Sequence, residues 1–283
     1  MQNILSIDLE SWLDFYKDAL TLKSDKFEPS KPNDKNYIPC AVDNILEILK
    51  KYEQKATFFI IAKIYDWYPE TIEKIQEYGH EIAYHTHNHL QLNINNLQSD
   101  IKESKVFLDR FKPKGFRAPR IYITKDCFKI LKDNGFLYSS SSYNVFDIQK
   151  IDGIYEIPIS TIPITSKYNK IEELPQQLSP AMFFKKIPFG SGLMVALLGN
   201  NLSFFIDRIN KKNIPAILFL HPWQIYQPEE INSFMFKLKV LVKNPLCFIY
   251  TRNILKQFEH LLSRYKFVSF EDYFEFLKPR NKE

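Results

Sequence analysis

The fold of this chain is decided by residues 56–90, which read ATFFIIAKIYDWYPETIEKIQEYGHEIAYHTHNHL. The apolar run at 56–62 is typical of a buried strand. Residues 69–78 have proline in the first turn of a helical pattern that ends at Gly79, and HEIAYH at 80–85 is strand-like again. A strand, a helix and a second strand in this order predict two parallel strands joined by a helix.

The same alternation continues on both sides of this stretch. We expect strands at 3–9 and 215–220, a helix at 41–52 and one long amphipathic helix at 94–111. Repeated strand–helix units imply a parallel sheet covered by helices, either open or closed into a barrel. In both arrangements the functional side chains gather at the C-terminal ends of the strands.

One segment, 158–200, breaks the alternation. It contains five prolines and has Gly190 and Gly192 near its end. We interpret it as an irregular excursion that packs over the barrel or borders the cleft. Residues 1–283 are therefore expected to form one domain.

The composition is that of a globular protein large enough to bury its own core. Of the 283 residues, 45% are hydrophobic and 25% are charged, and the net charge is +5. No basic run is long enough to indicate a nucleic acid partner, so we expect none. The longest apolar stretches, such as 214–220, are far too short to span a bilayer.

The N-terminus and the cysteines bear on the cellular compartment. Residues 1–12, MQNILSIDLESW, have no basic region and no small-residue cleavage site, so we interpret them as a strand and not as a signal peptide. Cys40, Cys127 and Cys247 are widely spaced, and we expect them to be reduced and buried. Both features predict a cytoplasmic protein. The sequence contains no signal for the oligomeric state.

Four of the six histidines lie within ten residues, at His80, His85, His87 and His89. Histidine is the commonest protein ligand of transition metals. His85 and His89 would share one face of a helix, and on an extended segment His87 would point the same way as both. These two could bind a metal with one or two carboxylates, or the segment could be a histidine-rich surface loop. We expect His80 to pack or to orient a loop, and His87 to be a neighbour of the site.

Other candidate residues lie at or just after strand-like runs. Asp8 and Glu10 alternate at the end of the first strand, so both carboxylates project to one side, unless Asp8 only caps a turn and Glu10 is exposed. Arg117 in GFRAPR could hold a carboxylate in a bidentate pair, or could be a surface arginine. His221 in LFLHPWQ could be a general acid or base, or a core histidine.

Together these motifs resemble those of the polysaccharide deacetylase family, the nodulation-type chitooligosaccharide deacetylase homology domain. SIDLESW, GHEIAYHTHNH, GFRAPR and LFLHPWQ follow one another in the order of the family's motifs over most of the chain. Their order is far more specific than any one motif alone. The resemblance implies a distorted (β/α) barrel of about seven strands.

The resemblance also implies a metal site. A divalent ion, expected to be zinc, would be held by Glu10, His85 and His89. The family usually has Asp at the position of Glu10, and the longer side chain reaches the ion if the backbone lies slightly further away. Trp12 or Trp223 could stack on a sugar face, as could Tyr122.

The implied reaction is hydrolysis of an N-acetyl group on a sugar of a surface glycan or its precursor. Asp8 would be the catalytic base, kept ionised and oriented by Arg117. His221 would donate a proton to the departing sugar amine. Without a signal peptide, the substrate would be reached from the cytoplasm, which favours a nucleotide-linked, lipid-linked or growing glycan.

Two alternatives stay open from the sequence. A related barrel hydrolase could act on another non-peptide C–N bond without metal, and the glutamate at position 10 favours this reading mildly. A catalytically silent carbohydrate-binding protein could also have kept the barrel. The joint presence of Asp8, Arg117 and His221 argues against a silent protein.

Overall fold

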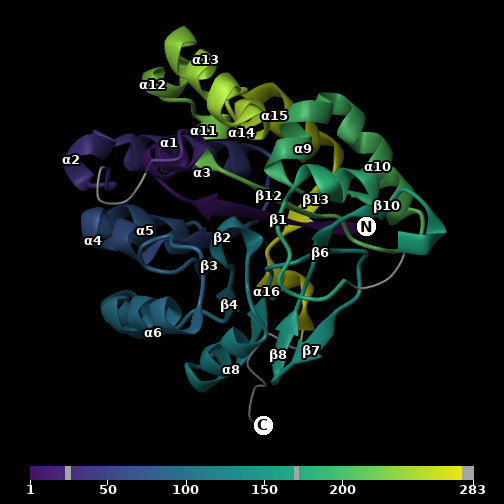
Figure 1. Cartoon of the computed structure of the whole chain (residues 1–283), viewed down its shortest axis with the longest axis horizontal. Coiled ribbons are helices and arrows are strands. Elements are labelled where there is room, and N and C mark those ends of the chain that lie inside the picture. The colour runs from purple at the N-terminus through teal and green to yellow at the C-terminus, as the bar shows by residue number, and fades with distance from the viewer. Residues whose placement is uncertain (23–26, 169–171, 276–283) are drawn as a thin grey trace.

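A computed structural model of the chain describes residues 1–22, 27–168 and 172–275 (Figure 1). The strands in these ranges are β1 (Gln2–Leu9), β2 (Thr57–Ile60), β3 (Glu81–Tyr84), β4 (Gly115–Phe116), β5 (Tyr138–Ser139), β6 (Tyr143–Asn144), β7 (Gln149–Ile151), β8 (Ile154–Glu156), β9 (Ile159–Ser160), β10 (Ile162–Pro163), β11 (Lys186–Ile187), β12 (Ile217–Leu220) and β13 (Lys266–Val268).

The α-helices in the same ranges are α1 (Trp12–Ala19), α2 (Lys31–Asp34), α3 (Tyr37–Lys51), α4 (Ala62–Trp67), α5 (Pro69–Glu77), α6 (Ile94–Glu103), α7 (Lys105–Phe111), α8 (Asp126–Asp133), α9 (Gly192–Leu198), α10 (Leu202–Asn210), α11 (Pro222–Ile225), α12 (Glu229–Asn232), α13 (Phe234–Lys243), α14 (Pro245–Tyr250), α15 (Leu255–Arg264) and α16 (Phe270–Tyr273). None of them is long and apolar enough to cross a membrane, a finding that covers the described residues.

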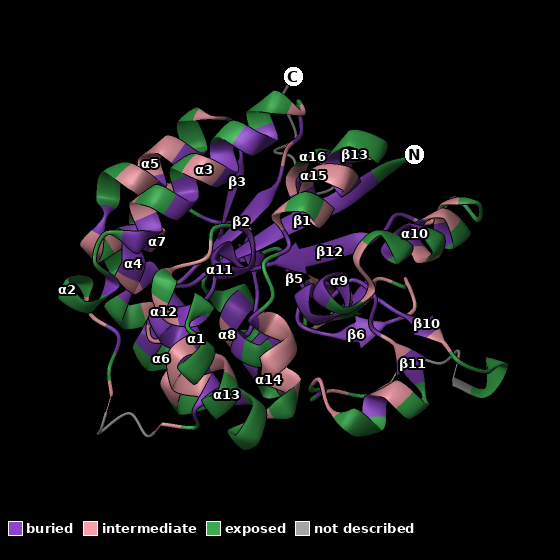
Figure 2. Cartoon of the chain, turned by 90° about the horizontal axis from the view of Figure 1, so that it is seen from above, coloured by how far each residue is buried: buried purple, intermediate pink, exposed green. Residues whose placement is uncertain are grey.

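The largest sheet has the strand order β12-β1-β2-β3-β4-β5-β8-β7, and β13 also pairs with β1. Every neighbouring pair from β12 to β8 is parallel, whereas β7 runs antiparallel to β8. The strands lie in the centre of the molecule and helices surround them (Figure 2). In the described part of the chain, this curled sheet, with seven parallel strands from β12 to β8 and β13 as an eighth beside β1, confirms the predicted distorted (β/α) barrel.

Between β8 and β12 the barrel wall is built by the excursion predicted from the prolines. Gly190 donates from its backbone to Ser160 O (3.0 Å), and its own carbonyl accepts from Phe219 N in β12 (2.9 Å). A Cβ atom at Gly190 would lie 2.2 Å from Ile217 O, so only glycine permits this close approach. Residues 169–171 of the excursion lie outside the described residues, and the single domain stays a prediction.

Side chains along β1 alternate between two environments, as a strand requires. Leu5, Ile7 and Leu9 are buried in the main core that the surrounding helices share. Burial of each such side chain contributes about 1.5–3 kcal/mol. Ser6 and Asp8 lie on the opposite, inner face and are also buried. Polar groups buried inside the barrel need hydrogen-bond or ion-pair partners there.

The opposite end of the barrel, where the parallel strands begin, is filled by α16. Phe270 stacks on Tyr138 and meets Phe59 edge to face, with ring centroids 5.1 and 5.8 Å apart. Both partners are fully buried, so this end is packed with aromatic side chains. A functional site is therefore expected at the other end, the C-terminal end of the strands.

A buried carboxylate, Glu81, lies beside this aromatic cluster. It accepts hydrogen bonds from Thr57 Oγ1 (2.6 Å), Tyr138 Oη (2.9 Å) and Glu271 N (2.9 Å). Burial raises the pKa of Glu81 to about 7, because the three donors offset only part of the cost of removing the charge from water.

Two sequence expectations are corrected by the structure. The helix expected at 94–111 is divided at Ser104, whose hydroxyl is 2.9 Å from the hydroxyl of Tyr84 and 3.3 Å from His87 Nδ1. A serine hydroxyl bonded outside the helix competes with regular helical geometry. Cys40, expected to be buried, is exposed on α3, whereas Cys127 is buried and Cys247 is half-buried.

Candidate active site

The register of the sheet brings the candidate residues to one edge. Leu9 pairs with Ile60, which pairs with Tyr84, so the parallel strands β1, β2 and β3 end at the same level. The residues that follow β1 and β3 are Glu10 and His85. By the same reasoning the residues after β4 and β12, Arg117 and His221, emerge at this edge too.

Asp8 and Arg117 form a buried ion pair inside the barrel. Arg117 Nη1 lies 2.6 Å from Asp8 Oδ1 and 2.7 Å from Ser6 Oγ. The remaining guanidinium donors reach Ser140, with Nε on the carbonyl and Nη2 on Oγ, both at 2.9 Å. Arg117 has no exposed surface, and its guanidinium lies over the ring of Phe59 at 4.0 Å. Asp8 is thereby held in one orientation by a rigid cation.

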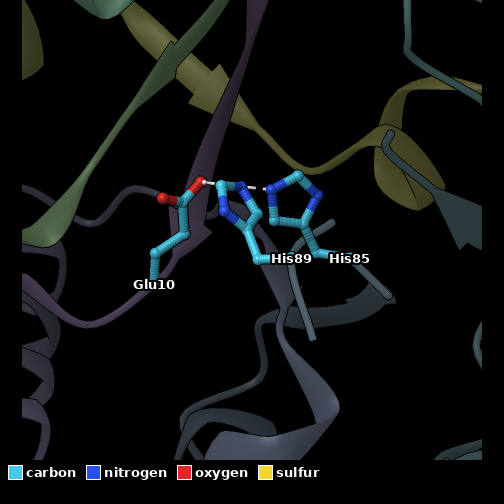
Figure 3. A group of neighbouring side chains, drawn as sticks. All are labelled: Glu10, His85 and His89. Carbon is cyan, nitrogen blue, oxygen red and sulfur yellow. Dashed lines mark hydrogen bonds and ion pairs between the residues drawn. The ribbon is translucent and has the colours of Figure 1, made fainter. Parts of the chain in front are cut away.

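Glu10, His85 and His89 converge on one point (Figure 3). Glu10 Oε1 lies 3.2 Å from both His85 Nε2 and His89 Nε2. One ligand atom from each residue lies within 4.8 Å of the other two. Atoms bound tetrahedrally to zinc at about 2.0–2.1 Å are about 3.3 Å from one another. The two distances of 3.2 Å from Glu10 Oε1 fit such a site.

The protons on the two rings support the same conclusion. His85 Nδ1 lies 2.7 Å from the backbone carbonyl of Arg117, which only accepts, so Nδ1 carries the proton. The lone pair of a neutral His85 is then at Nε2 and faces the carboxylate oxygen of Glu10. His89 Nε2, also 3.2 Å from that oxygen, has no hydrogen-bond partner. Electron pairs facing each other in a buried site require a proton or a cation between them, so the donor set fits a divalent ion.

The loop that carries both histidines is neither helical nor extended, in contrast to the two geometries considered from the sequence. Thr86 and His89 have positive φ values of 64° and 52°. This region costs a residue such as threonine on the order of 1–3 kcal/mol. Thr86 O accepts from Ala62 N (2.9 Å), and Thr86 Oγ1 accepts from His89 N (3.2 Å). These two hydrogen bonds stabilise the turn. The strained turn directs both imidazoles towards Glu10.

Charges within the site shift two pKa values strongly. Burial alone would raise the pKa of Glu10, but the adjacent His89 and His85 and the nearby His221 hold it well below its usual range. Burial would lower the pKa of His89, but Glu10, with Asp14 and Asp18 behind it, raises it to about 9. The site thus keeps its carboxylate ionised and attracts positive charge.

His221 lies beside this group, with Nε2 3.8 Å from Glu10 Oε1. The amide nitrogen of Gln224 donates to Gly192 O (2.9 Å), so the amide oxygen faces His221. That oxygen lies 3.1 Å from both His221 N and His221 Nδ1. An acceptor at Nδ1 places the proton there, and Nε2 is the ring atom that faces the site. Trp223 stacks on the imidazole with ring centroids 4.4 Å apart.

These residues line a cleft of about 470 Å³ at the C-terminal edge of the barrel. Its walls include Asp8, Glu10, His89 and His221, together with Phe15, Lys17, Asp18, Thr21, Leu22, Arg120, Ile121, Tyr143, Gln177, Leu178, Leu193, Phe219, Trp223, Asn244, Leu246, Cys247 and Tyr250. The volume is that of a site for a small molecule or one end of a larger one.

Among the three aromatic residues suggested for sugar stacking, only Trp223 lines the described cleft. Trp12 is buried and packs edge to face against Tyr16, and Tyr122 does not line the cleft in the described part of the chain. Arg120 does line it and donates from Nε to Asp18 Oδ2 (2.9 Å) at its rim.

Neither of the other two clustered histidines belongs to the group that converges on Glu10. His80 directly precedes β3, at the end of the strand that is opposite the cleft. Its Nδ1 accepts from Ala56 N (3.3 Å). Its pKa is lowered to about 4, first by burial and then by the charge of Lys55. His87 Nε2 lies 3.7 Å from Asp66 Oδ2. Both positions agree with the packing and neighbouring roles expected for them.

Sequence reasoning missed three residues that position the others: Ser6, Ser140 and Gln224. Ser6 could have been found, because it precedes Asp8 by two residues and a strand places both on one face. Gln224 stands three residues after His221, the spacing of a capping box, and its side-chain oxygen accepts from His221 N. Ser140 reaches Arg117 from a different strand, which no local spacing reveals.

Two family models together match most of the chain. Residues 32–139 match the family described as polysaccharide deacetylase, and residues 140–275 match a domain of unknown function, DUF3473. His85, His89 and Arg117 lie in the first match and His221 lies in the second. Asp8 and Glu10 precede both. The site is therefore assembled from three parts of the sequence.

Curated relatives are similar over shorter stretches. A peptidoglycan-N-acetylglucosamine deacetylase of Bacillus cereus is 33% identical over 103 residues, 35% of this chain and 48% of the relative. A second protein of that name and organism is 27% identical over 143 residues, 48% of this chain and 52% of the relative. The chain spans about half the length of these curated relatives.

The fold is also found among solved structures. A crystal structure from Mycobacterium smegmatis described as a polysaccharide deacetylase covers 100% of this chain, which in turn covers 94% of it, with a TM-score of 0.56 and 17% identity. At this identity the likeness concerns the barrel alone. The motif order and the family match agree, and residues 32–139 of the chain belong to the polysaccharide deacetylase family.

Proposed function

We propose that this protein is a metal-dependent hydrolase that removes the N-acetyl group from a sugar of a surface glycan or its precursor. The observation that carries the proposal is the convergence of three imidazole Nε2 atoms on Glu10 Oε1, at 3.2, 3.2 and 3.8 Å. A buried Asp–Arg pair stands in the same cleft. Metal ligands, a base and an acid are the groups that amide hydrolysis needs together.

The metal would be held by Glu10, His85 and His89, and we propose zinc. A divalent ion bound there supplies Lewis acidity, which polarises the acetyl carbonyl and makes a water molecule more acidic. Asp8 and His221 also come within 4.8 Å of Glu10. Asp8, however, forms an ion pair with Arg117 and is therefore not assigned as a metal ligand. We assign Asp8 and His221 to proton transfer.

Proton transfer by the chain's own residues completes the reaction. Asp8 takes a proton from the attacking water as the new C–O bond forms on the acetyl carbon. His221, protonated on both ring nitrogens, donates its Nε2 proton to the sugar nitrogen as the C–N bond breaks, which yields acetate, a free amine and a neutral imidazole. Arg117 orients Asp8, and Gln224 keeps the proton on Nδ1 of His221, so that Nε2 faces the cleft.

The substrate class rests on the family and on the relatives. The two Bacillus cereus relatives are named for N-acetylglucosamine in peptidoglycan. We propose an N-acetylhexosamine unit as the part of the substrate that enters the cleft, whose volume of about 470 Å³ has room for it. A cytoplasmic site of action stays a prediction.

An acetate-release assay tests the proposal. Protein loaded with zinc or cobalt is incubated with free, nucleotide-linked, lipid-linked and oligomeric N-acetyl sugars, and acetate and new amines are quantified. We expect release from at least one class and its loss in His221→Ala. Release that persists after complete metal removal would instead support a metal-free hydrolase, and binding of sugars without any release would support a carbohydrate-binding protein.

A further inference from the structure

The helix α13 exposes a continuous apolar stripe on the surface of the protein. It lies at the outer edge of the molecule in both views (Figures 1 and 2). Phe234 and Val242 are 76% and 77% exposed. The large apolar side chains exposed on this helix are Phe234, Met235, Leu238, Leu241 and Val242. Five such residues within one ten-residue helix form a patch rather than the scattered exposure that is normal on protein surfaces.

The positions of these residues place them on one face. At about 100° per residue, 234, 235, 238, 241 and 242 fall within a sector about 120° wide. Phe236 and Val240 lie on the opposite face and are buried against the protein. A helix that is apolar on both sides needs a second apolar surface in addition to the core.

Lysines flank the stripe on both sides. By the same geometry, Lys237 lies beyond one border, and Lys239 and Lys243 lie beyond the other. The sequence of α13, FMFKLKVLVK, contains no acidic residue. Within the described ranges, none of these lysines forms an ion pair: Lys237 donates to Asn232 Oδ1 and Lys243 to Leu20 O. The border of the stripe is therefore positively charged.

We propose that α13 binds the surface of an anionic lipid bilayer, lying in the plane of the interface. The apolar stripe would enter the boundary between headgroups and acyl chains, and the lysines would reach the anionic headgroups on either side. A second copy of the chain fits less well, because a two-fold contact through this face would bring the lysines of both copies together without a carboxylate on α13.

The location of α13 relative to the cleft adds to the proposal. The chain passes from Lys243 directly into Asn244, Leu246 and Cys247, which line the cleft. A protein bound through α13 would thus keep one wall of its cleft next to the lipid surface. This inference goes beyond the proposed function, since lipid binding is measured without any catalytic readout.

Vesicle co-sedimentation of the full chain tests the proposal. Phosphatidylcholine vesicles with and without phosphatidylglycerol are compared at low and high salt. We expect binding to the vesicles that contain phosphatidylglycerol, weakened by salt. Phe234→Ser combined with Val242→Ser should lower the partition coefficient at least about tenfold. The control is Phe204→Ser, which removes a 63% exposed apolar side chain from α10 and should leave binding unchanged.

A second variant tests the charged border without touching the apolar stripe. Replacing Lys237, Lys239 and Lys243 by Gln should lower binding about fivefold for each lysine removed. The matched control replaces by Gln the exposed Lys211 and Lys212 of the turn after α10.

Two results would overturn the proposal. One is failure of the parent protein, with unchanged circular dichroism, to bind phosphatidylglycerol vesicles at low salt. The other is a concentration-dependent dimer in light scattering that Phe234→Ser with Val242→Ser dissociates, because the stripe would then be an interface between two copies of the chain.

Discussion

Arg117 Nη1 and Asp8 Oδ1 lie 2.6 Å apart at a place where neither side chain has appreciable contact with water. The pair joins β1 to the end of β4 and sets the position of the proposed base. The guanidinium also donates to Ser6 and Ser140, so its donors are satisfied only while these strands remain in register. Catalysis and stability are therefore coupled at this pair.

Asp8→Asn should abolish acetate release and also destabilise the protein. Loss of the base should lower the rate about 10²–10⁴-fold. Removal of one partner of a buried ion pair leaves the charge of Arg117 uncompensated, which typically costs about 3–5 kcal/mol. Urea denaturation and single-turnover acetate release measure the two effects. Asp18→Asn, which breaks a partly exposed pair with Arg120, is the stability control and should cost about 1 kcal/mol or less. A fully active Asp8→Asn variant would remove Asp8 from the mechanism.

His85→Ala should lower metal stoichiometry and activity together. The variant keeps only Glu10 and His89 of the proposed ligands, and an incomplete set binds a divalent ion weakly. Elemental analysis after incubation with zinc or cobalt measures the stoichiometry. His87→Ala changes a histidine of the same loop that lies outside the site, and it should bind metal like the parent. If the parent binds no ion in stoichiometric amount, the metal assignment fails.

His221→Ala separates the two possible ligand sets. Because Asp8 is paired with Arg117, we expect this variant to retain its metal and to lose activity about 10²–10⁴-fold. Loss of the ion from this variant, with retention in His85→Ala, would instead assign the site to Asp8, Glu10 and His221.

Gln224→Leu should lower kcat with little effect on KM. Without the amide oxygen, Nδ1–H of the protonated His221 loses its acceptor, so the proposed acid is less stable and less well oriented. Gln224→Glu offers a carboxylate at the same place, which stabilises the protonated imidazole and should move the alkaline limb of the rate profile to higher pH. Equal loss of activity in both variants, with no shift of the profile, would indicate that Gln224 only supports the fold of α11.

Glu81→Gln should change how stability depends on pH. The pKa of Glu81 is raised from 4.5 to about 7 in the folded protein, so its contribution is fully present below pH 4.5 and is lost as the pH rises through 7. This difference between the two pKa values corresponds to about 3 kcal/mol in the free energy of unfolding. The glutamine stays neutral, so the variant should gain stability relative to the parent between pH 5 and 8. Urea denaturation across this range measures the difference, and a constant difference would contradict the raised pKa.

The sequence by itself determined a parallel sheet covered by helices and the identity of the candidate residues. Periodic apolar runs at 56–62 and 80–85, separated by a helix that starts at Pro69, are local signals that need no knowledge of distant contacts. The motif order added the family. Parallel strands end at one edge, so the location of Glu10, His85, Arg117 and His221 at that edge also followed from the chain order.

The tertiary structure alone decided the turn at Thr86 and His89, the closing of the barrel by Gly190, and the partners of Arg117. Positive φ at a threonine is locally unfavourable and persists only because Ala62 and the surrounding loop hold it. The apolar stripe of α13 was likewise hidden in the sequence, because FMFKLKVLVK is apolar on both sides of a helix. Which side is buried depends on the elements that pack against it, and these are distant in sequence.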